Sequence, residues 1–354
     1  MVEAAHTIAS EYSNDRNILG VLIREPVPDD PDFPQTCDIE LALVVADLVV
    51  SSERGYVLTR RAVEDVLVDV CAVEKRWMLA PDTNPLVWIL SLGDPRAFEV
   101  MRDYSAGELT QLFPNFKRFY LRSAPTRVSY WLAEAKKRLD AALNVNNESI
   151  LRTPEAAYSL VYLTCALLDS SGRSFAGSYL KLPRNLRLLN DGLADELGEY
   201  LPAADKDPLE AANKIPLLAS QLGSEYPPRE VLTPQHAAEV NYNLSPLEVE
   251  YRSFVVREIA SKDKLTALWY ARAWSTYLLL HYGNVMKALK GSFTLPSGPM
   301  STWREILGNP SLASIELFVG WIDEIYGFCV EGCKELGIPY GRTNANSNWS
   351  RPKA

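Results

Sequence analysis

The chain has 354 residues, of which 47% are hydrophobic and 10% aromatic, and its formal net charge is −9. This length and apolar content provide for a sizeable buried core and exclude a disordered polypeptide. No segment approaches the roughly 18 consecutive apolar residues of a membrane-spanning helix. The first residues also lack the basic and then apolar stretch of a secretory signal, so we expect a cytoplasmic protein without membrane contact.

The first third of the chain is predicted to be helical. Between residues 59 and 71, apolar residues recur at three- and four-residue spacing behind Thr59, a residue type that caps helices: Ala62, Val63, Val66, Leu67, Val70 and Cys71. Short β-branched runs such as Val44-Val45 lie inside helical patterns, and no Asn-Gly or Asp-Gly turn joins two alternating segments. Strands are therefore not expected.

Later helices have clear start signals. A capping side chain is followed by proline at five places, which are Thr153-Pro154, Asp207-Pro208, Thr233-Pro234, Ser245-Pro246 and Asn309-Pro310. The segment from Pro154 to Asp169 is apolar nearly all round and is predicted to be a central helix. Apolar residues from Ile315 to Cys333 form one stripe of a last long helix that stops at Gly337. The sequence thus predicts an all-α fold.

We predict that this all-α fold consists of two packed helical lobes with a basic groove between them and flexible terminal segments. The N-terminal helical lobe spans residues 37–200, and the C-terminal helical lobe spans residues 201–338. An N-terminal arm covers residues 1–36. A flexible tail covers residues 339–354, which are rich in Asn, Ser and Arg and have almost no apolar anchors.

No catalytic or metal-binding motif is recognisable. The five cysteines are scattered in mostly apolar patterns and are expected to be buried free thiols: Cys37, Cys71, Cys165, Cys329 and Cys333. The three histidines, His6, His236 and His281, have no Cys, His or carboxylate at metal-ligand spacing. No glycine-rich phosphate-binding loop is present. We therefore expect no metal, no cofactor, no small-molecule substrate and no enzymatic activity.

Charge is unevenly distributed along the chain. Residues 111–190 carry 12 basic and 5 acidic side chains, a net charge of +7 in an acidic protein. Lys and Arg can neutralise phosphates, and aromatic rings can stack on unpaired bases. The pattern predicts a groove for single-stranded nucleic acid formed by Lys117, Arg118, Arg122, Arg127, Lys136, Lys137, Arg173, Lys181, Arg184, Arg187, Phe116 and Tyr120. The alternative is a set of solvated helix faces with aromatic residues in the core.

A short motif adds a family resemblance. Ser174-Phe175-Ala176-Gly177-Ser178-Tyr179 is similar to the Phe-Ser-Ala-Gly-Ser-Tyr stretch of paramyxovirus nucleoproteins, which precedes their RNA-contacting helices. The Trp-Ser-Tyr-Ala-Met-Gly that follows in that family is replaced by Leu180-Lys181-Leu182-Pro183. With a helical pattern, an acidic total charge and a basic middle, the chain resembles the all-helical nucleoproteins of negative-strand RNA viruses.

That resemblance implies a viral nucleoprotein or capsid protein in the host cytoplasm and the virion. Such a protein self-assembles into a homo-oligomer or polymer and coats single-stranded RNA without sequence specificity. Two other interpretations stay open. The chain is a helical interaction scaffold whose basic face binds an acidic protein partner, or it is an enzyme of a helical class that its motifs do not reveal.

Overall fold

The computed structural model describes residues 2–24, 39–46, 59–63, 66–79, 98–122, 124–144, 149–172, 180 and 182–335. The chain forms two compact units, each assembled from separated stretches of sequence. Unit 1 consists of Met1–Arg76, Ala97–Gln111 and Ala203–Pro310, and unit 2 of Trp77–Arg96, Leu112–Pro202 and Ser311–Ala354. The predicted lobes are continuous in sequence, with a boundary after residue 200, whereas the chain passes between these units several times.

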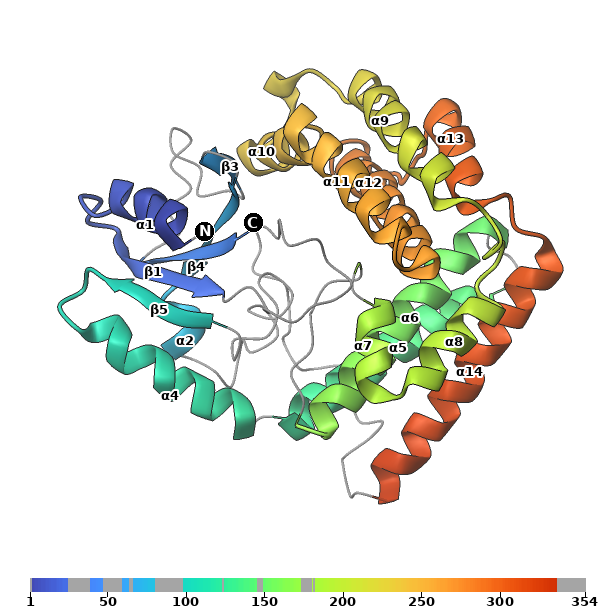
Figure 1. Cartoon of the computed structure of the whole chain (residues 1–354), viewed down its shortest axis with the longest axis horizontal. Coiled ribbons are helices and arrows are strands. Elements are labelled where there is room, and N and C mark those ends of the chain that lie inside the picture. Colours follow the sequence, from blue (N-terminus) through green and yellow to red (C-terminus); the bar gives the residue numbers. More distant parts are fainter. Residues whose placement is uncertain are drawn as a thin grey trace. The chain divides into compact units, whose positions relative to one another are not determined.

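A mixed five-stranded sheet replaces the helices predicted for the first third of the chain (Figure 1). Its strands are β1 (Ile18–Arg24), β2 (Ile39–Val45), β3 (Thr59–Val63), β4 (Val66–Glu74) and β5 (Phe98–Asp103), and the short helix α2 (Arg76–Leu79) follows β4. The strand order is β3-β4-β2-β1-β5. β2 and β4 are parallel, and the other neighbouring strands are antiparallel. The protein is therefore an α/β protein, and the prediction of an all-α fold is wrong.

The segment predicted as one helix from residue 59 to residue 71 forms β3 and much of β4. In β4, Val68 and Val70 are buried on one face of the strand, and Val73 is buried on the other. A strand with apolar residues on both faces lacks a clear period of two, so its spacing can be mistaken for that of a helix. The valines favour a strand, since β-branched side chains pack well on a pleated surface.

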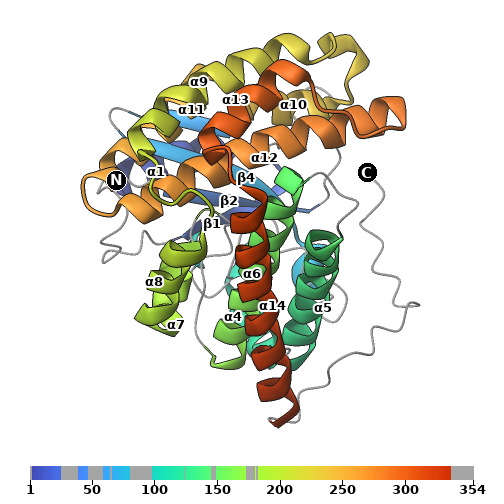
Figure 2. The same ribbon diagram turned by 90° about the vertical axis from the view of Figure 1, so that its right-hand side faces the viewer.

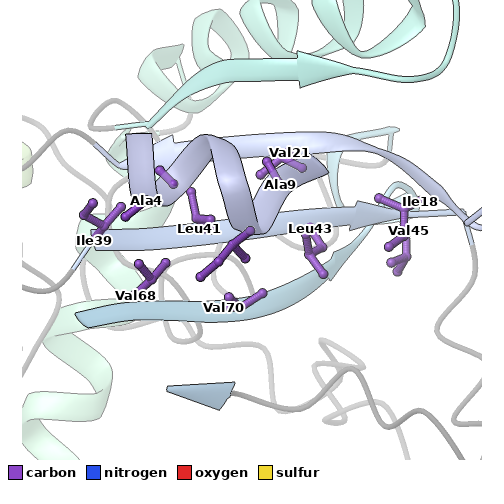
Figure 3. Packing of buried hydrophobic residues seen from close by; sticks show 12 residues of the cluster. Ala4, Ala9, Ile18, Val21, Ile39, Leu41, Leu43, Val45, Val68 and Val70 are labelled. Carbon is purple, nitrogen blue, oxygen red and sulfur yellow. The ribbon is translucent and has the colours of Figure 1, made fainter. Parts of the chain in front are cut away.

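One face of the sheet is covered by α1 (Val2–Glu11). Figure 3 shows Ala4 and Ala9 of this helix in a buried cluster with Leu41 and Val70 of the strands. Complete burial of one Leu or Val side chain stabilises a fold by about 1.5–3 kcal/mol. The predicted N-terminal arm, residues 1–36, therefore contains a packed helix and an interior strand of the sheet, β1.

The helix α4 (Glu108–Arg122) is anchored to the end of β5 by Asp103. Its carboxylate accepts hydrogen bonds from the backbone N–H groups of Ser105 and Thr110, both at 2.8 Å, and from their hydroxyl groups, both at 2.7 Å. Partial burial acts to raise the pKa of Asp103, but the hydrogen bonds outweigh it and hold this pKa well below the usual carboxyl range. The Asp103 carboxylate thus stabilises the first turn of α4.

The described part of unit 2 is helical. α5 (Ala124–Leu143) packs along α6 (Ser149–Ser170), and α14 (Leu312–Glu335) lies beside both (Figure 2). α7 (Leu182–Leu189) and α8 (Asp191–Tyr200) also belong to this unit. The predicted central and last helices are confirmed as α6 and α14. The helix start predicted at Thr153-Pro154 is wrong, because α6 begins at Ser149 and contains Pro154.

Unit 1 also contains a group of helices, which are α9 (Pro208–Glu225), the 3-10 helix η3 (Arg229–Val231), α10 (Pro234–Asn243), α11 (Pro246–Ala260), α12 (Lys264–Lys290) and α13 (Ser297–Leu307). Three predicted starts are confirmed, since Asp207, Thr233 and Ser245 each accept a hydrogen bond from a backbone N–H of the first turn. The start predicted at Asn309-Pro310 is displaced, because Ser311 accepts the N–H of Ser314. Within the described ranges, no helix has the length and apolar character that a membrane span requires.

Candidate functional site

Three members of the predicted nucleic-acid groove lie in the core. Phe116, Tyr120 and Arg127 have exposed fractions of 1%, 0% and 1%. Arg127 donates hydrogen bonds to both carboxylate oxygens of Asp169, at 2.6 and 2.8 Å, and lies over the ring of Tyr120 at 3.7 Å. Buried rings cannot stack on bases, and a buried guanidinium cannot reach a phosphate. The assignment of these three residues to a nucleic-acid site is therefore wrong.

The two lysines of α5 in that prediction are exposed and paired with acidic neighbours on the same helix. Lys136 forms an ion pair with Asp140, and Lys137 lies 3.5 Å from Glu134. Ion pairs of this kind, three or four residues apart on a helix surface, contribute about 0.3–0.5 kcal/mol. Their charges are partly neutralised within α5 itself.

The remaining described cations of the predicted groove lie on two helices, α4 and α7. Lys117 of α4 lies 5.2 Å from the ring centre of Phe113, and Arg118 is exposed. Arg184 and Arg187 are half-buried on α7. Three further members of the predicted groove, Arg173, Lys181 and the side chain of Arg122, lie outside the described residues, as does the segment 174–179 that carried the family resemblance.

A different set of residues, three charged and one aromatic, comes together on the sheet. In-register pairing joins Phe98 of β5 to Arg24 of β1, Arg24 to Glu40 of β2, and Glu40 to Asp69 of β4. Residues paired in this way project from the same face of a sheet. The adjacent residues of β2 and β4 pack against α1, so this set projects from the opposite face. We call these four residues the charged row.

An ion pair orders one half of the charged row. Arg24 Nη1 donates to Glu40 Oε2 at 2.6 Å, and the guanidinium carbon lies 6.0 Å from the ring centre of Phe98. Phe98 is completely buried, whereas the side chains of Arg24 and Glu40 are 14% and 34% exposed and Asp69 is half-buried. The row thus places two neighbouring carboxylates beside an arginine that packs near a buried ring.

The thiol of Cys71 reports on the electrostatics of these carboxylates. Its Sγ donates to the carbonyl oxygen of Leu41 at 3.3 Å. Burial, and then the negative charges of Glu40 and Asp69, raise the pKa of Cys71 well above the usual thiol range. The thiol therefore stays protonated at neutral pH, which makes it a poor nucleophile and a poor metal ligand. Of the polar groups on this face, the two carboxylates and not the thiol are therefore the candidates for binding a cation.

The two carboxylates suit one kind of metal ion better than others. Among the described residues, no group of three or more His, Cys, Asp and Glu side chains is arranged to hold a metal ion. A structural Zn²⁺ site needs four protein ligands, and Ca²⁺ takes six to eight oxygens. Mg²⁺ is commonly held by one or two carboxylates, with water and substrate phosphates as its other ligands. Glu40 and Asp69 therefore fit Mg²⁺ that arrives with a phosphate-bearing ligand.

Sequence reasoning missed the charged row because it expected no strands: it placed Asp69 in a helix and Arg24 in the N-terminal arm. One signal was available: Glu40 stands between Ile39 and Leu41, and Asp69 between Val68 and Val70. A single carboxylate inside an apolar run is costly in a buried strand unless a cation or hydrogen bonds compensate it. Each position alone can also be an ordinary half-buried carboxylate, and only the pairing of β2 with β4 brings the two together.

The chain matches no protein-family model and no curated protein. Among solved structures, the crystal structure of a nucleotidyltransferase-like protein from Exiguobacterium sibiricum 255-15 is similar to it, with 14% sequence identity and a TM-score of 0.33 over 97% of this chain and 95% of that chain.

These comparisons do not point to viral nucleoproteins, and the mixed sheet contradicts an all-helical family. The predicted membership of that family is wrong, and so is the predicted function of a virion nucleoprotein or capsid protein that packages RNA. Both depended on an all-helical pattern, whereas the first third contains a sheet, and on the basic stretch 111–190, part of which lies in the core. The expected partners, single-stranded RNA and further copies of the chain, stay predictions.

Proposed function

We propose that the protein is a Mg²⁺-dependent phosphoryl-transfer enzyme that binds a nucleoside triphosphate at the charged row. The observation that carries this proposal is the in-register pairing of Glu40 with Asp69 on parallel strands, next to Arg24. This proposal differs from the expectation that the chain has no enzymatic activity and no small-molecule substrate.

Electrostatics supports a cation at the paired carboxylates. In-register residues on neighbouring strands have backbones about 4.8 Å apart, and like charges at such positions repel each other. Arg24 offsets part of this repulsion through its ion pair with Glu40. A divalent cation held by Glu40 and Asp69 would offset more of it and would leave Arg24 able to turn towards an anion.

Arg24 supports a phosphate as the second ligand. Its planar guanidinium presents a fork of donors that matches phosphate oxygens, and Phe98 limits the orientations that it can adopt. A metal-complexed triphosphate requires negative groups for the metal ion and a positive group for the phosphate. The two carboxylates and Arg24 provide this charge pattern. When bound, Mg²⁺ supplies charge neutralisation at the phosphate oxygens, while Arg24 orients the phosphate.

The test is calorimetric titration of ATP into the protein with Mg²⁺ and with EDTA. We expect binding that depends on Mg²⁺ and that weakens by about 10-fold or more when Glu40→Gln and Asp69→Asn are combined, since a hydrogen bond to a charged group contributes about 1.5–3 kcal/mol. Arg24→Gln should weaken binding both with and without the metal ion. In a separate incubation with Mg²⁺ and ATP, release of ADP would indicate attack at the γ-phosphorus and release of pyrophosphate attack at the α-phosphorus.

Glu99→Gln is the matched control. Glu99 is an exposed carboxylate of β5 in the same sheet, but it pairs with Ile23 and therefore projects from the face that carries α1. We expect its removal to leave nucleotide binding unchanged. Absence of Mg²⁺-dependent binding in the natural protein, or an equal loss in the Glu99 variant, would contradict the proposal.

A further inference from the structure

A chain of hydrogen bonds joins three helical segments of unit 1. The hydroxyl oxygen of Tyr226, at the end of α9, lies 2.9 Å from His281 Nδ1 on α12. The other ring nitrogen, His281 Nε2, lies 3.1 Å from Glu239 Oε2 on α10. A hydroxyl group, an imidazole and a carboxylate thus lie in hydrogen-bonding sequence.

The chemistry of the three groups fixes the positions of the protons when His281 is neutral. An ionised carboxylate only accepts hydrogen bonds, so Nε2 carries the ring proton and donates it to Glu239. Nδ1 then has a lone pair and accepts the O–H of Tyr226. Hydroxyl, imidazole and carboxylate are therefore arranged as nucleophile, base and orienting group, the order that base-assisted nucleophiles use.

The surroundings hold the phenol in its neutral form until it reacts. Burial, and then Tyr277, Tyr282 and the charge of Glu239, raise the pKa of Tyr226 well above the usual phenol range. The Tyr282 ring packs edge-on against Tyr226 with ring centres 4.9 Å apart. Tyr226 nevertheless keeps a partly exposed surface, and the His281 side chain is 12% exposed. Both side chains are therefore largely buried but keep some contact with solvent.

We propose that Tyr226, His281 and Glu239 form an acid–base relay that makes the Tyr226 hydroxyl a nucleophile towards neutral acyl donors. Tyr226 Oη forms a bond to the carbonyl carbon of an ester, and the bond from that carbon to the alcohol oxygen breaks. The phenol proton passes to His281 Nδ1 and then to the departing alcohol. Glu239 remains a carboxylate and stabilises the imidazolium that forms in between.

Charge decides in favour of an acyl donor over a phosphoryl donor. The Glu239 carboxylate is part of the relay, and the backbone carbonyl of Glu225 lies at the hydroxyl of Tyr282, 3.3 Å away. Negative charge and carbonyl dipoles repel a phosphate dianion but not an uncharged ester. The relay consists of contacts remote from the charged row in sequence, and it does not depend on the phosphoryl-transfer function proposed for that row.

The test uses p-nitrophenyl acetate as the probe, with the full-length protein at neutral pH. Acetylated tyrosines are mapped and timed by peptide mass spectrometry. Tyr277 provides a comparison inside the same molecule, because it is more exposed, at 38%, and its hydroxyl oxygen accepts a hydrogen bond from Asn243 instead of contacting a base. If the relay operates, Tyr226 is acetylated faster than Tyr277. If exposure alone governs reactivity, Tyr277 is acetylated first, and the proposal is overturned.

Variants separate the relay from a purely structural network. His281→Asn should slow acetylation of Tyr226 by about 100-fold or more, since a positioned general base contributes about 10²–10⁴-fold. Glu239→Gln keeps an acceptor for Nε2 but removes the charge and should slow it less. In the His281→Asn variant the acetylation rate of Tyr226 should rise with pH as for an unassisted phenol. An unchanged rate in both variants would overturn the relay; if His281→Asn does not fold, the Glu239→Gln rate and the Tyr226 to Tyr277 ratio decide.

Discussion

Two arginine–carboxylate pairs of this protein have the same N···O distance and different surroundings. Arg127–Asp169 in unit 2 and Arg24–Glu40 on the sheet are both 2.6 Å apart. The side chains of the first pair are 1% exposed each, whereas those of the second are 14% and 34% exposed. The charges of the buried pair have no access to solvent or to a ligand, so they stay paired with each other. The partly hydrated pair can exchange its ion-pair contact for a contact with a ligand. Burial, and not the contact itself, therefore separates a structural ion pair from one available to a ligand.

The largest effect is expected when the buried pair is broken. Arg127→Met leaves the Asp169 carboxylate buried without its main cation and removes a hydrogen bond to the backbone carbonyl of Tyr120. Removal of one partner of a buried ion pair costs about 3–5 kcal/mol. Urea denaturation should show a loss of this size in the free energy of unfolding.

Arg138→Met is the control for that measurement. Arg138 also lies on α5 and pairs with Glu155 at 3.0 Å, but both side chains are about one third exposed, at 33% and 27%. We expect a loss of about 1 kcal/mol or less. Equal losses in the two variants would show that burial does not distinguish the pairs.

A smaller effect is expected at Asp103, where hydrogen bonds rather than an arginine compensate the charge. Asp103→Ala removes the acceptor of the first turn of α4 and should cost about 1 kcal/mol at pH 7. The pKa of Asp103 is lower in the folded than in the unfolded chain, so the stabilisation is complete above the usual carboxyl pKa of about 4 and is lost as the pH falls below it. Urea denaturation at pH 7 and pH 3 should show a difference that shrinks at pH 3; a difference that grows would contradict this account.

In contrast to the buried pair, the partly exposed pair Arg24–Glu40 should affect ligand binding more than stability. Glu40→Gln is expected to change the free energy of unfolding by less than about 1 kcal/mol, because a partly hydrated ion pair contributes little. The same variant should weaken Mg²⁺-dependent binding of ATP. Denaturation and titration of one sample give both quantities, and a large stability loss without a binding defect would assign Glu40 to the fold.

The smallest effect is expected at the exposed cation of α4. Arg118→Ala should change the free energy of unfolding by no more than about 0.5 kcal/mol, as is usual for surface positions. Thermal denaturation followed by circular dichroism is sufficient to measure it. A loss as large as that of Arg127→Met would mean that the cations of the basic stretch 111–190 belong to a single buried network.

Helix starts were predictable where the signal and its partner lie within one turn. Ser245 accepts the N–H of Glu248 three residues later, and Asp207 accepts that of Leu209. The strands were not predictable in this way, because β4 carries apolar residues on both faces and its partner β2 is a separate segment. Arg127 was misassigned for a related reason: a basic residue in a stretch that also contains aromatics suits a nucleic-acid groove and a buried ion pair equally well.

The sequence alone determined that α6 and α14 are helices and where three of the capped helices begin. These features depend on periodicity and on neighbours a few residues away. Only the tertiary structure decided which charges meet. Tyr226 and Glu239 lie 55 and 42 residues from His281, and the charged row combines four strands. Such contacts depend on which segments pack together, and that choice is made by the burial of the whole core and not by any local pattern.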